Sequence, residues 1–337
     1  MLSIELRPAT PLDRANSVAR GLFCWPALLP AVALACDAVC PIPLVALGQR
    51  PLWLDLAALG CVAWALAGRG RARLHDWDTP LDGRILAGIV LAILHVVSLR
   101  GEPEPIQWLR QIAAAGLCFY GLSARLRRES RAPDAIWPAF GIVVLALSAF
   151  VLGQVTQGVP ALEQAMRRVD DHWASHCGLA KALLLGTILC AGRAAEPGAR
   201  ALWRVTSLVG AVACGLCVFA GGSGLGIASL ASLDEPFYFG TSVVALLFLF
   251  GLARMAWALA RERVEEAGRW RAAAVAFPVI AALLLFGGTT GGEGLRALVA
   301  LAGAAVIASR VAPRAVVASA PGEGSQGSQA PASGRAA

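Results

Sequence analysis

The side chains best suited to chemistry in this chain are basic residues and histidines near the ends of apolar segments. Arginine pairs bind phosphate and pyrophosphate oxygens through parallel N–H donors. A histidine titrates near neutrality and can remove a proton from a hydroxyl group. The connection 157–176 concentrates such groups beside two carboxylates: Arg167, Arg168, Asp170, Asp171, His172 and His176. This composition suits the binding of a phosphorylated substrate together with general-base catalysis.

A second set of polar side chains lies inside apolar segments, one to two helical turns below one common surface: Asp55, His95, Arg110, Gln111, Lys181, Glu293 and Arg296. An ionisable group at the centre of a membrane helix costs ~2.5–3.5 kcal/mol on insertion scales. Each basic residue alone is explained by a side chain that extends to the lipid headgroups. Because all share one depth, we predict an outward-opening polar cavity in which His95, Arg110, Lys181 and Arg296 bind substrate.

Two other chemistries find less support in the spacing. Asp171, His172 and His176 offer carboxylate and imidazole ligands, but no third histidine or Glu-x-x-His pattern accompanies them, so we predict no metal. Cys214-Gly-Leu-Cys217 has the spacing of a redox motif but lies within an apolar segment. No cofactor is therefore predicted, and a solvated polar loop remains the alternative for the connection that carries the histidines.

Long apolar segments must position these residues. Hydrophobic residues make up 57% of the 337 positions and charged residues only 15%, whereas a soluble domain carries roughly 25% charged residues. Ten apolar segments can be read at about 21–43, 52–68, 85–99, 105–124, 135–157, 177–192, 201–222, 236–260, 272–288 and 294–309. Because lipid cannot satisfy free backbone groups, such segments cross as helices. The sequence predicts an all-α, polytopic membrane protein with about ten transmembrane helices.

The connections between these segments alternate between arginine-rich and arginine-poor. Most of the 29 lysines and arginines fall in alternate connections, at 1–20, 69–84, 125–131, 193–204, 261–271 and beyond 309. Arginine excess marks the cytoplasmic side, so we predict that both termini are cytoplasmic. The net charge of +7 is spread over many loops, which disfavours nucleic-acid binding. The predicted organisation is a cytoplasmic segment 1–20, a membrane domain 21–309 and a disordered cytoplasmic tail 310–337.

Three stretches in the second half of the chain carry a family resemblance. Residues 171–186 take an outer loop back into a helix through small and polar residues, 218–230 form a glycine-rich helix end, and 237–250 begin a late helix with an early glycine. In these features the chain resembles the O-antigen ligase and polymerase-like family of bacterial envelope glycan enzymes, over roughly 85–309. Gly224 stands where the family has arginine, and a short connection without histidine replaces the family's large outer loop.

The resemblance implies an inner-membrane enzyme that transfers a glycan from an undecaprenyl-pyrophosphate carrier to an acceptor, without metal or nucleotide. The pyrophosphate would contact Arg110, Arg167, Arg168 and Arg296. His172 or His176 would deprotonate the acceptor hydroxyl. Two other classes stay open. A non-catalytic component of an envelope-assembly complex accords with the departures from the family. A small-solute permease needs ionisable groups along its whole path, whereas the inner half of the segments is nearly free of them apart from Arg254.

Overall fold

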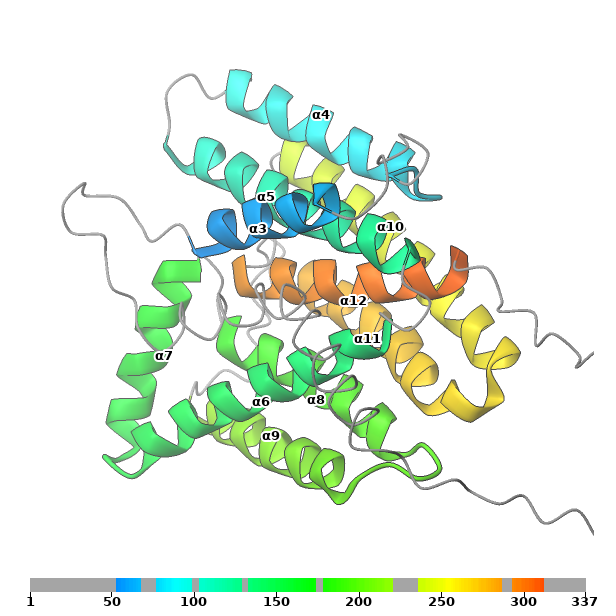
Figure 1. Ribbon diagram of the computed structural model, residues 1–337. Helices are drawn as coiled ribbons and strands as arrows, with labels where there is room; N and C mark the ends of the chain where they lie inside the picture. Colours follow the sequence, from blue (N-terminus) through cyan, green and yellow to red (C-terminus); the bar gives the residue numbers. More distant parts are fainter. Residues whose placement is uncertain are drawn as a thin grey trace, which may run out of the picture.

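The computed structural model describes residues 53–67, 77–98, 103–128, 133–173, 178–220, 236–286 and 293–311, and these residues are helical apart from short turns. The helices, shown in Figure 1, are α3 (Trp53–Leu66), α4 (Asp82–Ser98), α5 (Pro103–Arg128), α6 (Pro133–Val155), α7 (Val159–Trp173), α8 (Gly178–Ala194), α9 (Ala201–Ala220), α10 (Pro236–Glu262), the short 3-10 helix η5 (Val264–Glu266), α11 (Ala267–Phe286) and α12 (Glu293–Val311). The predicted all-α class is confirmed for this part of the chain.

The second to tenth apolar segments each coincide with one helix, α3 to α6 and α8 to α12. The first segment, 21–43, lies outside the described residues, as do the predicted cytoplasmic segment 1–20 and most of the tail 310–337. Three helices contain 20-residue stretches long and apolar enough to cross a membrane: Ile136–Val155, Ala201–Ala220 and Val243–Glu262. The chain is therefore a helical protein with several candidate membrane spans.

Helix α7 is longer than the sequence predicts and packs differently. Within the connection 157–176, the sequence pattern predicts a short amphipathic helix over 163–169 that lies on the membrane. Instead α7 begins at Val159, directly after a turn in which Gly158 adopts a left-handed conformation (φ +108°). Its apolar side chains are buried against α6, α8 and α9: Leu162, Ala165, Met166 and Val169. Figure 1 shows α7 standing across the end of α6 at one edge of the bundle. Protein, and not lipid, covers its apolar face.

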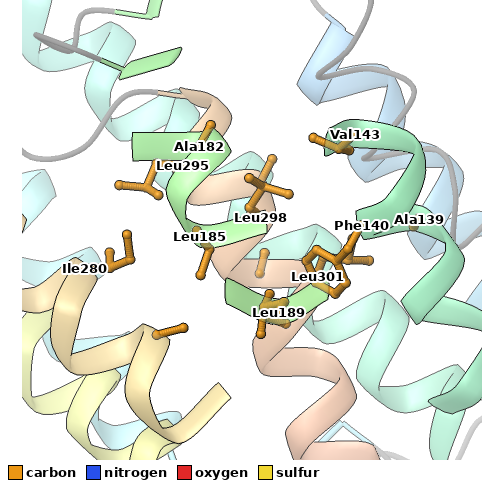
Figure 2. Packing of buried hydrophobic residues seen from close by; sticks show 14 of the residues in the cluster. Ala139, Phe140, Val143, Ala182, Leu185, Leu189, Ile280, Leu295, Leu298 and Leu301 are labelled. Carbon is orange, nitrogen blue, oxygen red and sulfur yellow. The ribbon is translucent and has the colours of Figure 1, made fainter. Parts of the chain in front are cut away.

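The core forms around α8, which is buried along almost its whole length. A helix that is apolar on all sides is stable only when neighbours surround it. Figure 2 shows side chains from α6, α8, α11 and α12 meeting there: Phe140, Val143, Leu185, Leu189, Ile280, Leu298 and Leu301. Other helices expose one apolar side, most clearly α4 (Leu86, Val90, Val97) and α9 (Leu202, Leu208, Phe219). In water such faces would be unfavourable, and a lipid environment removes that cost.

Helix α12 identifies the two ends of the bundle. Near its start, Arg296 donates a hydrogen bond to Gln111 in the first half of α5. At its other end, Arg310 pairs with Glu262 at the end of α10. The contacts therefore separate an arginine-poor end, where α5 and α12 begin, from an arginine-rich end, where α10 and α12 finish. The alternation of arginine along the chain predicts that these two ends face opposite sides of a membrane.

Candidate functional site

Two polar pairs lie at the arginine-poor end of the bundle, and we call them together the outer cluster: Asp55 with Arg110, and Gln111 with Arg296. The Nε atom of Arg110 lies 3.6 Å from Oδ2 of Asp55 on α3. The next residue, Gln111, accepts a hydrogen bond from Nη1 of Arg296 on α12. Consecutive residues of a helix point about 100° apart. Helix α5 therefore presents Arg110 to α3 and Gln111 to α12, which joins three helices through polar contacts.

The Arg110 guanidinium is positioned but incompletely hydrogen-bonded. The side chains of Arg110 and Asp55 are 32% and 26% exposed. The Nε and Nη2 atoms of Arg110 are shielded from solvent and donate to no atom of the described residues. Nε and Nη2 form one edge of the guanidinium, with two parallel donors that fit two oxygens of one carboxylate or phosphate group. Asp55 faces this edge at a distance longer than a hydrogen bond.

Two further predicted binding residues lie on neighbouring helices, and both are buried. His95 continues the face of α4 formed by Arg84 and Gly88, which packs against α10. Lys181 lies one turn before Leu185 in α8, and its side chain is fully buried. His95 therefore follows the contact of α4 with α10, whereas Lys181 is enclosed within the central helix α8.

The basic residues of α7 occupy a different surface. Arg167 is 76% exposed and pairs with Glu163 one turn earlier, at 2.6 Å. Arg168 is also exposed. Helix α7 packs on α6, α8 and α9, whereas the outer cluster comes from α3, α5 and α12. The backbone of His172 lies in the last turn of α7, and His176 lies outside the described residues. A joint action of these histidines with the outer cluster remains a prediction.

A second polar site, at the arginine-rich end, was not predicted from the sequence. Glu196, just after α8, accepts hydrogen bonds from Nε and Nη2 of Arg269 at 2.6 and 3.0 Å, and from the Arg269 backbone N–H at 3.2 Å. Arg193 also pairs with Glu196. The Arg269 and Glu196 side chains are only 5% and 2% exposed. The Arg269 guanidinium lies 5.6 Å from the ring centre of Trp137 on α6. We call this set the inner network.

The inner network connects the ends of several helices. The Nη1 atom of Arg263 lies 3.6 Å from Oε2 of Glu266. The Nη2 atom of Arg263 donates a hydrogen bond to the Ser309 carbonyl oxygen of α12 at 2.7 Å. Glu266 in turn accepts from the indole N–H of Trp270 at 3.1 Å. The only sequence signal for this site is a glutamate within an arginine-rich connection. Its partner lies 73 positions away, so spacing could not identify the pair.

The fold and these two sites define a helical bundle with candidate membrane spans and polar clusters at opposite ends. Within the described ranges, no group of three or more His, Cys, Asp or Glu side chains is placed to hold a metal ion. No family model, curated protein or solved structure matches this chain.

Proposed function

We propose that this chain is a multi-pass protein of the bacterial inner membrane, with ten crossings and both termini in the cytoplasm. Three helices are long and apolar enough to span a membrane, and α4 and α9 expose large apolar side chains along one side. The convergence of the connections 193–200 and 261–266 with Arg310 at one end supports a cytoplasmic assignment for that end.

Two glycine turns allow the topology to be tested in the full chain. Gly158 joins α6 to α7, and Gly198 joins α8 to α9; each has a positive φ. We expect an epitope inserted at Gly158 to bind antibody on intact spheroplasts. An epitope at Gly198 should bind only after the membrane is permeabilised. Accessibility of both epitopes from the same side would contradict the proposed topology, and each insertion serves as the control for the other.

For the outer cluster we propose the binding of the pyrophosphate of an undecaprenyl-pyrophosphate-linked glycan, followed by transfer of the glycan to an acceptor. The proposal rests mainly on Arg110, whose Nε and Nη2 donors are not engaged by the described residues, and on Arg296, which is bonded to the next residue of α5, Gln111. Two arginines beside the pyrophosphate would stabilise the charge that develops on the leaving group.

The other predicted residues would complete the site. Lys181, which is buried in α8, would add positive charge, and His95 would line the region between α4 and α10. Arg167 and Arg168 would meet the substrate at the surface of α7. His172 or His176 would take the proton of the acceptor hydroxyl as its oxygen bonds to the sugar carbon, while the bond between that carbon and the pyrophosphate breaks.

A non-catalytic role in an envelope-assembly complex is the second candidate. The observation in its favour is that Arg110 and Arg296 already contact Asp55 and Gln111. In that case the outer cluster acts as a clamp among α3, α5 and α12, because polar contacts between helices hold them together in lipid. The two candidates make different predictions for substitutions at Arg110.

If the cluster binds pyrophosphate, Arg110→Ala should reduce surface glycan by about 100-fold, the range seen when one donor to a developing charge is removed. Lipid-linked glycan should accumulate, and Arg296→Ala should behave alike. The matched control is Arg310→Ala, which removes a partly exposed arginine paired with Glu262 at the opposite end of the bundle. Both cluster variants must be present in the membrane at the wild-type level.

Normal surface glycan in Arg110→Ala and Arg296→Ala strains, with the proteins present, would refute the binding role. The clamp alternative predicts a lower unfolding temperature for Arg110→Ala without any accumulation of lipid-linked glycan. Arg110→Lys separates the roles further. It retains a charge opposite Asp55 but loses the two parallel donors, so it should restore a clamp and not a pyrophosphate site.

A further inference from the structure

Helices α3 and α5 approach each other unusually closely. The side of α3 that packs on α5 consists of small buried residues: Ala57, Ala58, Cys61 and Ala65. On α5, a Cβ atom added at Gly121 would lie 2.8 Å from the carbonyl carbon of Cys61. Real Cβ atoms do not approach backbone so closely, so only glycine permits this crossing. The two backbones are therefore nearly in contact at Cys61.

Two thiols meet at this crossing. Cys61 and Cys118 are fully buried and both are reduced. The two thiols are close enough to interact with each other. The same helix pair is held at its two ends by Asp55 with Arg110, at 3.6 Å, and by Trp64 with Arg125, whose guanidinium lies 5.4 Å from the indole ring centre. The thiol pair therefore lies between two fixed contacts, which keep the sulfurs adjacent.

We propose that Cys61 and Cys118 form a redox-sensitive pair that closes to a disulfide and locks α3 onto α5. A disulfide needs Cα atoms roughly 4.4–6.8 Å apart, which only closely packed helices provide. The oxidant class is dioxygen. Two S–H bonds break and one S–S bond forms, and dioxygen takes up the two electrons and two protons to become hydrogen peroxide. This inference does not depend on glycan transfer.

The apolar surroundings of the two thiols favour an apolar oxidant. The neighbouring buried residues are apolar, among them Ala58 and Leu122, and polar, water-soluble oxidants enter such an apolar site poorly. Dioxygen is apolar and dissolves in the hydrocarbon core. Once formed, the bond would close a loop that contains α4, and such a cross-link raises stability by restricting the unfolded chain.

The test uses full-length protein in membranes treated with copper phenanthroline in air. After quenching, denaturation and alkylation with N-ethylmaleimide, mass spectrometry of the digest should find a Cys61–Cys118 linked peptide in most wild-type molecules. Dithiothreitol should remove it. The oxidised protein should also unfold several degrees higher than the reduced protein in detergent.

Cys118→Ala should lose both the linked peptide and the rise in unfolding temperature. Cys190→Ala, which removes a buried thiol of α8, should retain both. Alkylation of Cys61 and Cys118 in the oxidised wild-type protein would overturn the proposal. A linked peptide with no change in unfolding temperature would contradict the claim that the disulfide locks α3 onto α5. Both results come from wild-type protein, so the proposal stays testable if a variant fails to fold.

Discussion

Replacing Glu196 with glutamine is expected to lower the free energy of unfolding by about 3 kcal/mol or more, the cost of breaking a buried ion pair by removing one partner. Glutamine keeps the size of the side chain but removes its charge. The Arg269 guanidinium, only 5% exposed, would then keep its charge without the carboxylate that accepts from its Nε and Nη2 atoms. Arg193 would lose the same partner.

The matched control is Glu163→Gln on α7. Glu163 also pairs with an arginine, at 2.6 Å, but the partner Arg167 is 76% exposed. Exposed pairs one helical turn apart contribute about 0.3–0.5 kcal/mol. Thermal and SDS-induced unfolding in detergent should therefore show a much larger loss of stability for Glu196→Gln than for Glu163→Gln. Equal stability of Glu196→Gln and Glu163→Gln would show that burial does not strengthen the Glu196–Arg269 pair.

Substituting alanine for Gly268 is expected to cost at least 1–3 kcal/mol, the range for overpacking a well-packed contact. At the crossing of α8 and α11, a Cβ atom on Gly268 would lie 2.5 Å from the carbonyl oxygen of Gly192 and 3.1 Å from Cγ of Glu196. Backbone cannot yield as a flexible side chain can, so the two helices must separate. The separation would also weaken the bonds between Glu196 and Arg269.

Gly215→Ala on α9 provides the comparison, because no atom lies within 4 Å of its added Cβ. Alanine exceeds glycine in helix propensity by roughly 0.8–1.0 kcal/mol, so this variant should be as stable as wild type or more stable. The Gly268→Ala and Glu196→Gln effects should not add, because both act on one contact. A Gly268→Ala protein with wild-type unfolding temperature would contradict the close packing of α8 on α11.

The sequence predicted the positions of the helices better than the contacts between their side chains. Hydropathy located every helix from α3 to α12 except α7, for which it predicted only 163–169 of Val159–Trp173. The prediction stopped short because the apolar residues of α7 are few, and their burial depends on α6, α8 and α9. Depth along the segments grouped Asp55, Arg110, Gln111 and Arg296, and the structure shows two contacts among them, Asp55 with Arg110 and Gln111 with Arg296.

The inner network shows where charge counting fails. The alternation predicts that Arg269 is an ordinary member of an arginine-rich connection that faces the cytoplasm. The structure buries it between Glu196 and Trp137. A basic residue just inside the start of a helix can face solvent or the bundle, and only the rotation of α11 about its axis decides between them.

The sequence alone determined the series of apolar helices and the alternation of arginine between their ends. Both follow from the hydropathy and charge of each segment, which do not depend on the segments that pack beside it. Only the tertiary structure decided which side chains meet: Asp55 with Arg110, Glu196 with Arg269, and Cys61 with Cys118. These pairs depend on which helices are neighbours and how each is rotated. Close packing at small residues such as Gly121 and Gly268 settles both.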